Sequence, residues 1–346
     1  MSRRALTLLV SGFLVLALGI GGALVDVPYV VLSPGPTENT LGQIDKQPVI
    51  KITGRETYPT SGSLRLVTVA YQGGPTSQID LLTALRGWID PTVAVVPQET
   101  IFAPDRSQKE VEEENTVEMT NSQDDATAAA LNELKIPYRT VISVVSVAKD
   151  KPAAGKIEKG DEITSVDGEP VTKTEEVGEA VRARRAGEEV TFGITRGDED
   201  LKITVPTVAA DGEPVVGVSM RATYKFPFEV DINVGEVGGP SAGLMFSLGI
   251  VDKLTEGPMT GGKQIAGTGT IKPDGTVGPI GGIPQKLVGA RDAGATIFLT
   301  PAGNCAEAMK AVPDGLRLVK AETLNSARLA IEALVSGKGK VPSCSG

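Results

Sequence analysis

Residues 5–25 form an uninterrupted apolar stretch, ALTLLVSGFLVLALGIGGALV, which contains no charged residue. At 1.5 Å per residue, a helix of this length spans about 31 Å, which matches the hydrocarbon core of a bilayer. Arg3 and Arg4 precede the stretch, and the positive-inside rule places them in the cytoplasm. The sequence therefore predicts a single-pass anchor within residues 1–25, with the remaining chain on the outer side of the cell membrane.

A cleaved signal peptide is the alternative interpretation of this stretch. The apolar region of a signal peptide is shorter than residues 5–25 and ends at a small-residue cleavage site of the A-x-A type. A clean site of this type is missing here, which favours the anchor. Whether the anchor is ever cleaved is left open.

The composition is that of folded protein and excludes several kinds of function. Apolar residues make up 40% and charged residues 22% of the chain. The net charge of −9 argues against a nucleic-acid partner, which requires a basic surface. The chain has no histidine and only two cysteines, too few to form a four-ligand zinc site. We expect neither a metal nor another cofactor.

The two cysteines are Cys305 and Cys344. Outside the cytoplasm, a disulfide between them would tie the C-terminal tail, residues 339–346, to the body of the protein. Two unpaired thiols are the alternative.

The first part of the chain after the apolar stretch shows three patterns. Residues 26–58 carry prolines and glycines around short apolar runs, which is typical of an extracytoplasmic connection leaving the membrane. Residues 61–71 alternate between two faces and predict a strand. Residues 108–134 predict a long helix with an alanine-rich face in its second half. We interpret its acidic first half as a solvated face rather than as a cation site.

Residues 137–208 predict a separate, mostly-β domain with one helix. Its motifs are Pro152-Ala153-Ala154-Gly155, Gly160-Asp161-Glu162-Ile163 and Val166-Asp167-Gly168 followed by Pro170-Val171. These motifs resemble those of a bacterial PDZ domain. The resemblance implies a domain that binds a peptide as an added strand at a sheet edge, often with capture of its C-terminal carboxylate. A carboxylate-binding loop is not evident in the sequence, so capture of C-termini is left open.

The segment Gly239-Pro240-Ser241-Ala242-Gly243 fits the G-x-S-x-G pattern, which presents a nucleophilic serine on a tight turn before a helix. A serine hydroxyl is a poor nucleophile unless a base takes its proton, and no histidine is present. A neutral lysine can replace histidine in this role. Lowering the pKa of a lysine to about 7–8 requires burial or a positive potential nearby.

Three lysines near Ser241 in the sequence are poor candidates for this base. Lys253 lies about 18 Å along the helix predicted after Ser241. Lys272 lies beside a Pro-Asp-Gly turn, where a solvated lysine is expected. Lys263 ends a G-x-x-x-x-G-K segment, but Gln264 stands where a Walker A motif has Ser or Thr, so we do not predict ATP binding.

Lys286 is the stronger candidate. Pro284 suits the first position of a helix, which places Lys286 in the first turn and on the face that carries Leu287. Burial and the positive end of the helix dipole would both lower the pKa of its amine. A lysine that extends into solvent is the alternative, and the spacing alone does not decide between the two.

Residues 226–302 resemble the proteolytic domain of the Lon family, which are serine peptidases with a Ser–Lys dyad. The matching motifs are Gly239-Pro240-Ser241-Ala242-Gly243, Thr268-Gly269, and Gly278-Pro279-Ile280-Gly281-Gly282-Ile283 followed by Lys286. The resemblance implies that Ser241 is the nucleophile, that Lys286 is the base and that the Thr268 hydroxyl lies near the lysine. It also implies oxyanion donors among the backbone N–H groups from Gly239 to Ala242.

Residues 59–136 resemble the N-terminal part of the same domain, through SGSLRLVTV and the helix with Met119 and Ser122. The PDZ domain would then be inserted into one discontinuous protease domain, whose catalytic part is residues 209–338. Two departures stand out. The ATPase module of the family has no counterpart in this sequence, and Gly238 stands where bacterial Lon proteins usually have an acidic residue.

The predicted fold class is α+β: a Lon-type proteolytic domain of mixed α/β layers, an inserted mostly-β PDZ domain and one N-terminal transmembrane helix. The predicted function is that of an ATP-independent, membrane-anchored serine endopeptidase that cleaves unfolded or loosely folded exported polypeptides. The expected partners are polypeptide substrates, the membrane through residues 5–25 and, by family resemblance, further copies in a hexamer. A catalytically silent peptide-binding scaffold or chaperone is the alternative, and self-processing is a third hypothesis.

Overall fold

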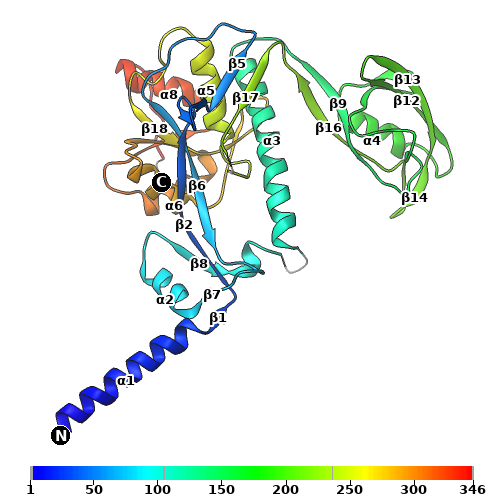
Figure 1. The fold of residues 1–346 in the computed structure, drawn as a ribbon. Coiled ribbons are helices and arrows are strands. Elements are labelled where there is room, and N and C mark those ends of the chain that lie inside the picture. The colour runs from blue at the N-terminus through cyan, green and yellow to red at the C-terminus, as the bar shows by residue number, and fades with distance from the viewer. Residues whose placement is uncertain (1–2, 104–105, 236, 345–346) are drawn as a thin grey trace. The chain divides into compact units, whose positions relative to one another are not determined.

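The computed structural model describes residues 3–103, 106–235 and 237–344, which form two compact units. Unit 1 combines Met1–Ile136 with Phe228–Gly346, and unit 2 is Pro137–Pro227 (Figure 1). The α+β fold class is thereby confirmed, with unit 2 inserted in the sequence of unit 1. Residues 1–2 of the predicted cytoplasmic segment and residues 345–346 of the predicted tail lie outside the described residues.

The predicted N-terminal helix is α1, Arg3–Ala23. It has 21 residues, and it is long and apolar enough to cross a membrane. Almost all of its side chains are exposed, as expected of a helix whose partner is not protein. A signal sequence near the N-terminus can also form a helix that is long and apolar enough, so the helix by itself does not distinguish an anchor from a signal sequence.

A six-stranded mixed sheet forms the centre of unit 1. Its strand order is β22-β21-β18-β6-β2-β8. The strands β6, β18, β21 and β22 are mutually parallel, whereas β2 and β8 are antiparallel to their neighbours. The bounds are Tyr29–Asn39 for β2, Ser63–Gln72 for β6, Ala94–Pro97 for β8, Gln264–Gly267 for β18, Ile297–Pro301 for β21 and Arg317–Ala321 for β22.

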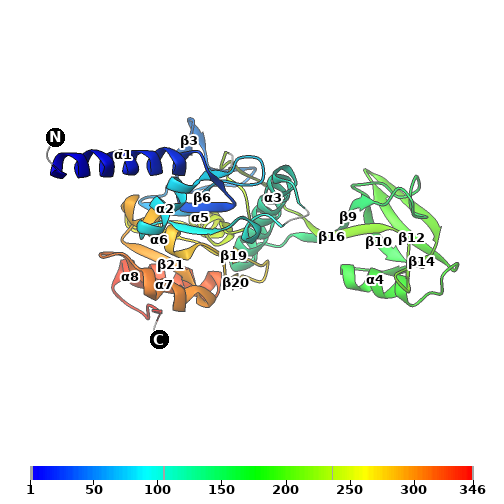
Figure 2. The same ribbon diagram turned by 90° about the horizontal axis from the view of Figure 1, so that it is seen from below.

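Helices cover this sheet because alternate strand residues face its two sides. Helix α6, Ile283–Asp292, packs on β2 and β6, where Val67 faces it, and lies beside α7, Cys305–Ala311 (Figure 2). Helix α5, Gly243–Leu254, contacts β6, β18, α3 and α8, with α3 spanning Gln108–Glu133 and α8 Leu324–Ser336. Almost the whole surface of α5 is buried, so it is the central helix of unit 1.

The interval 26–58 does not form the connection that the sequence analysis predicted. It supplies β2, which hydrogen-bonds to β6 and β8 inside the central sheet, and β5, Ile50–Thr53, which pairs with β17, Glu229–Ile232. Pro34 and Pro36 obscured the strand pattern of β2. They lie where its register against β6 shifts, between Pro34 and Thr37, and an irregularity of this kind tolerates residues without an N–H.

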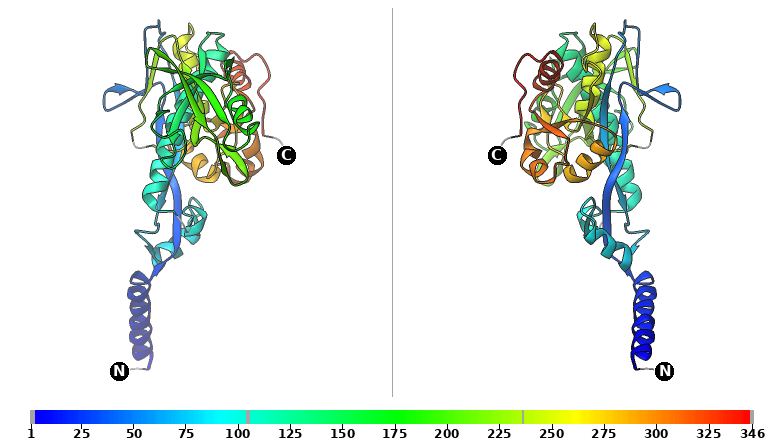
Figure 3. Two further views of the ribbon diagram at one scale, coloured as in Figure 1. Left: turned by 90° about the vertical axis from the view of Figure 1, so that its right-hand side faces the viewer. Right: turned by 90° about the vertical axis from the view of Figure 1, so that its left-hand side faces the viewer.

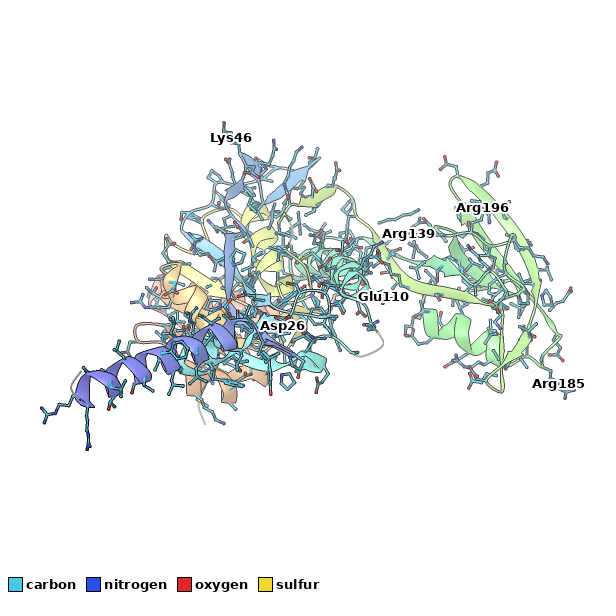
Figure 4. The ribbon with its side chains drawn as sticks, turned by 60° about the horizontal axis from the view of Figure 1, so that its bottom comes forward. Asp26, Lys46, Glu110, Arg139, Arg185 and Arg196 are labelled. Atoms are coloured by element: carbon cyan, nitrogen blue, oxygen red, sulfur yellow. A yellow bond between two sulfur atoms is a disulfide. The ribbon has the colours of Figure 1, made fainter. Side chains whose placement is uncertain are left out.

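Smaller elements complete unit 1. Strand pairs are formed by β1, Asp26–Val27, with β7, Ile79–Asp80; by β3, Gln43–Ile44, with β4, Gln47–Pro48; and by β19, Thr270–Ile271, with β20, Val277–Gly278. The remaining helices are α2, Leu81–Ile89, and the short 3-10 turns Gln98–Thr100 and Ala302–Asn304. The β3–β4 hairpin projects from the unit (Figure 3), with Lys46 in its turn (Figure 4).

Residues 264–278 form two separate elements. The first is β18, which lies between two parallel neighbours in the central sheet. The second is the short β19–β20 pair, which turns at Pro273-Asp274-Gly275 as predicted. The sequence pattern could not separate the two because Gly267 and Gly269 lie inside an otherwise strand-like run.

Unit 2 is a six-stranded antiparallel sheet with one helix, in which five strands follow the order β13-β12-β10-β9-β16 and β11 pairs with β10. Strands β9, Arg139–Val147, and β10, Glu162–Val166, precede helix α4, Thr174–Arg182, and the hairpin of β12, Glu189–Arg196, with β13, Glu199–Pro206, follows it. The remaining strands are β11, Glu169–Pro170, β14, Val208–Ala210, β15, Glu213–Val215, and β16, Val218–Lys225. Its separate core includes Ile142, Val177 and Phe192.

The C-terminal end of unit 2 lies at Pro227, not at the predicted residue 208. The reason is β16, which was predicted as a strand of the catalytic part. In the structure β16 pairs with β9 over its whole length, from Val218 opposite Val147 to Lys225 opposite Arg139. Such long-range pairing has no local sequence signal, so composition alone could not place the boundary.

A disulfide joins Cys305, at the start of α7, to Cys344 in the tail. The tail also contacts the edge of the central sheet, because the Lys320 N–H of β22 donates to the Pro342 carbonyl at 3.0 Å. The pairing that the sequence analysis considered is thus present in the structure, and it attaches the tail to unit 1.

We expect Cys344→Ser to lower the free energy of unfolding of unit 1. The disulfide closes a loop with a sequence separation of 39 residues. For a loop of this size, loss of the cross-link destabilises by about 4 kcal/mol. Denaturant unfolding of the variant and of the Cys305→Ser/Cys344→Ser double variant measures the effect. A reductant should lower the wild-type midpoint to that of the double variant, and equal midpoints for all oxidised proteins would contradict the prediction.

Candidate active site

Ser241 lies in a tight turn immediately before α5. Gly239 adopts a left-handed backbone conformation with φ of 84°, which other residues rarely tolerate. Ala242 is the N-cap residue, and α5 begins at Gly243. The predicted tight turn before a helix is therefore present, with α5 directly downstream of the serine.

Helix α3 holds this turn through two hydrogen bonds. The Gly239 N–H donates to the Asn115 carbonyl at 2.9 Å, and the Ser122 hydroxyl donates to the Pro240 carbonyl at 3.1 Å. Asn115 and Ser122 are seven residues apart and therefore lie two turns apart on one face of α3. The sequence analysis assigned neither residue a role, because the two halves of this arrangement are separated by all of unit 2.

The absence of an acidic side chain at position 238 has a steric explanation. A Cβ atom at Gly238 would lie 3.0 Å from the Asn115 Cβ, closer than most such contacts allow. A larger residue at this position would therefore push the nucleophile turn away from α3. The absence of a side chain at Gly238 leaves the space that the Asn115 side chain occupies.

Lys286 lies in the first turn of α6 as predicted, and Pro284 is the second helical residue, one position later than predicted. Its Nζ is 3.0 Å from the Ser241 Oγ and 3.3 Å from the Thr268 Oγ1. The side chain is only 4% exposed, so it does not extend into solvent. The structure thus brings together Ser241, Lys286 and Thr268 from three separate segments.

Thr268 follows β18 and is fully buried. Its hydroxyl donates to the Ser241 carbonyl at 3.0 Å, and the Gly269 N–H donates to the same carbonyl at 2.8 Å. Because the hydroxyl hydrogen is used in this way, the Thr268 oxygen can accept a hydrogen bond from the Lys286 amine. Thr268 therefore links the backbone of the serine to the side chain of the lysine.

Burial lowers the pKa of the Lys286 amine from its ordinary value to about 8. The physical cause is desolvation, which disfavours the charged ammonium form. The position of Lys286 in the first turn of α6 acts in the same direction. Near neutral pH, a useful fraction of this amine is therefore neutral and able to accept a proton.

The other three lysines do not take part in this arrangement. Lys253 is in the last turn of α5, at the opposite end of the helix from Ser241. Burial also lowers its pKa, yet the length of α5 separates its backbone from the serine. Lys272 is in the β19–β20 turn region, and Lys263 precedes β18 at the end distant from Thr268.

A cavity of about 200 Å³ lies beside the nucleophile turn. Pro240 and Ile271 form part of its wall, and Glu118 and Asp125 of α3 bring carboxylates to it. Lys272 also lines the cavity. The cavity therefore offers a space of mixed polarity next to Ser241.

Unit 2 has its own cavity, of about 470 Å³, between α4 and the segment from β15 to β16. Gly178 and Arg182 line it from the helix, and Val216, Gly217 and Met220 line it from the opposite side. Strand β16 is at the end of the sheet order, and its first residues line this space. The turn at Gly217, with φ of 84°, opens onto the cavity just before β16 begins.

A serine hydroxyl hydrogen-bonded to a buried lysine defines a hydrolase site of the Ser–Lys type. Two known domains match this chain: residues 198–330 match the Lon protease (S16) C-terminal proteolytic domain, and residues 116–207 match the PDZ domain. The chain therefore contains a PDZ domain and the proteolytic domain of the Lon-type (S16) serine peptidases, which have a Ser–Lys dyad.

This chain is similar in sequence to curated Lon proteases over part of their length. Lon protease 1 of Sorangium cellulosum is 45% identical over 94 residues, which are 27% of this chain and 11% of that protein. Lon protease 2 of Bacillus subtilis is 31% identical over 132 residues, which are 37% of this chain and 23% of that protein. The chain thus spans less than a quarter of the length of these relatives.

Solved structures similar to this chain include the PDZ domain of the SdrC-like protein from Listeria monocytogenes. It is 28% identical and covers 23% of this chain and 85% of its own, with a TM-score of 0.22.

We expect the Lys286 amine to titrate with a pKa of about 8. Below that pH the amine is mostly protonated, and above it mostly neutral, whereas an ordinary lysine stays protonated to about pH 10.4. Carbon NMR of ¹³Cε-labelled lysine follows this transition, and Lys286→Met assigns it by removing the signal. A Lys286 signal that moves only near the ordinary lysine pKa would contradict the prediction.

Proposed function

We propose that this protein is a serine endopeptidase in which Ser241 and Lys286 form the catalytic dyad. The observation that carries the proposal is the 3.0 Å separation of the Lys286 Nζ from the Ser241 Oγ in a site where the lysine is buried. The Lon-type domain match supports the same assignment. Peptide-bond cleavage needs this pair and no cofactor.

In this mechanism the neutral Lys286 amine accepts the Ser241 proton as the Oγ attacks the scissile carbonyl carbon. The resulting ammonium then donates that proton to the nitrogen of the leaving amine as the C–N bond breaks. A water molecule hydrolyses the acyl-enzyme by the reverse proton transfers, which restores the serine. Thr268 positions the lysine for both steps, because its oxygen accepts from the amine at 3.3 Å.

The geometry of the turn reduces the number of backbone N–H groups that could stabilise the oxyanion. Pro240 has no N–H, and the Gly239 N–H is bonded to the Asn115 carbonyl. Of the stretch predicted from the sequence, the Ser241 and Ala242 N–H groups are the remaining candidates. We assign them to the oxyanion of the tetrahedral intermediate, at the start of α5 where the helix dipole also favours negative charge.

We further propose that α1 anchors the protein in the membrane, with Arg3 and Arg4 in the cytoplasm and both units on the other side. The disulfide supports this placement, because disulfides persist in oxidising compartments. The substrates would be unfolded or loosely folded exported polypeptides, cleaved without ATP. Assembly into a hexamer stays a prediction from family resemblance.

The cavity of unit 2 is the proposed peptide-binding groove. A peptide strand could pair with the open edge of β16 while its side chains contact α4. Lys151 and Arg182 line the groove and supply positive charge for a C-terminal carboxylate. This groove would raise the local concentration of substrate for the protease site through attachment to the same chain.

We expect Ser241→Ala and Lys286→Met each to reduce cleavage of an unfolded protein by about 10³-fold or more, because each removes one member of the dyad. Digestion of a reduced, denatured substrate by the full chain in detergent, followed by mass spectrometry, measures the loss. Lys263→Met is the matched control, since it removes a lysine that lies away from the dyad, and it should retain activity. Undiminished cleavage in either dyad variant would refute the assignment.

The same experiment separates the enzyme from the alternative of a silent scaffold. A scaffold would bind peptide through unit 2 and would show no cleavage even in the wild-type protein. If instead the wild-type chain shortens only itself while Ser241→Ala stays intact, self-processing is the function.

We expect Gly178→Leu to weaken peptide binding by about tenfold, which corresponds to about 1.4 kcal/mol. A Cβ at Gly178 would meet only the flexible guanidinium end of Arg182, so α4 can accept the substitution while leucine fills the groove. Fluorescence anisotropy with labelled peptides measures the affinity. Glu179→Leu is the matched control, because Glu179 is exposed on the same helix and does not line the groove. Equal loss in both variants would contradict this groove.

A further inference from the structure

Helix α2 carries apolar side chains on two faces, and only one of them packs against protein. Ala84 and Gly87 are buried in a small cluster with Val31 and Ile79, and a Cβ at Gly87 would meet Val95. This inner face fixes α2 to strands β2 and β8.

The second apolar face of α2 is exposed. Leu85, Trp88 and Ile89 are 42%, 54% and 83% exposed. At 100° per residue these three positions share one side of the helix. Trp88 stands against Tyr29 with ring centroids 5.5 Å apart, so the indole is held at the surface rather than folded inward.

Helix α2 is attached directly to the C-terminal end of α1. The Leu81 N–H donates to the Val25 carbonyl at 2.9 Å, and β1 pairs with β7 so that Asp26 lies opposite Asp80. Gly22, the buried residue of α1, lies under Leu82, because a Cβ there would be 3.1 Å from the leucine Cδ2. Figures 1 and 3 show α2 next to this end of α1, and Figure 4 shows Asp26 there.

This attachment determines what surrounds the exposed face. If α1 spans the bilayer, its apolar run ends at Val25 and the first charged residue, Asp26, marks the outer surface. Leu81 is hydrogen-bonded to Val25 and is the first residue of α2, so α2 begins at the level of the lipid headgroups. Tryptophan is enriched at this level, and interfacial helices bury an apolar face about 5–10 Å into it.

We propose that α2 docks on the outer membrane surface, with Leu85, Trp88 and Ile89 inserted at the boundary of lipid headgroups and acyl chains. The proposal rests on the membrane anchoring of α1 proposed above. The docked helix is a second attachment beside α1, and it restricts how unit 1 rotates above the bilayer. The acidic chain, with a net charge of −9, does not need anionic lipid for this contact, because the inserted side chains are apolar.

The chain contains a single tryptophan, so Trp88 reports on this face without labelling. We would reconstitute the full chain into phosphatidylcholine vesicles and excite the fluorescence where tyrosine does not absorb. Lipids brominated near the headgroup should reduce the Trp88 emission by about half, and lipids brominated at the acyl-chain ends should reduce it less. Trp88 should also be less accessible to acrylamide in vesicles than in detergent.

The double variant Leu85→Ser/Ile89→Ser keeps Trp88 and should lose most of the quenching by shallow bromines. Leu329→Ser is the matched control, because Leu329 is 48% exposed on α8 in the same unit and should leave the quenching unchanged. Equal quenching in wild type and double variant would overturn the proposal. Shielding from acrylamide without quenching by brominated lipid would also overturn it, and would indicate a second protein copy on this face.

Flotation with the vesicles and hydrolysis of an unfolded protein are measured on the same samples. A chain that floats and cleaves while Trp88 stays accessible to water refutes only the docking of α2. A chain that does not float refutes the anchor and the docking together, whereas loss of hydrolysis alone refutes the peptidase and leaves the docking supported by the quenching.

Discussion

The hydrogen bond between the Lys286 amine and the Ser241 hydroxyl constrains how the segments of unit 1 around it are placed. A lysine that is 4% exposed is costly to bury as an ammonium ion, so the fold favours its neutral form. That form can act as a base only if a hydroxyl that gives up a proton lies within reach, and the Ser241 Oγ lies 3.0 Å from the Lys286 Nζ. Helix α6, the turn after β18 and the turn before α5 must therefore keep their relative positions on the central sheet.

The insertion of unit 2 separates, along the chain, the segments that must lie together around Ser241. The nucleophile turn follows unit 2 in sequence, yet Asn115 and Ser122, which hold that turn, precede it. The two segments of unit 1 are rejoined by the pairing of β5 with β17 and by the packing of α3 on α5. Unit 2 is therefore tolerated because the segments that precede and follow it pack against each other within unit 1.

Several elements could be predicted from the sequence because their signals are local. Examples are the alanine-rich face of α3, the alternation of β6 and the early proline of α6, Pro284. The elements that the sequence analysis placed wrongly have a different physical cause in common. Strand β2 contains prolines at a register shift, and β16 belongs to unit 2 only through its pairing with β9. Register and pairing depend on residues distant in sequence, which no local pattern reports.

The sequence by itself determined the chemistry that is available: no histidine, a serine in a G-x-S-x-G turn, a few lysines and one long apolar stretch. It could not decide which lysine lies beside the serine. The spacing alone did not show whether the Lys286 side chain is buried or extends into solvent. Tertiary packing made that decision by removing Lys286 from water and placing its Nζ beside a hydroxyl 45 residues away in sequence. The same packing selected Asn115, Ser122 and the exposed face of α2, since desolvation and long-range distances exist only once the chain has folded.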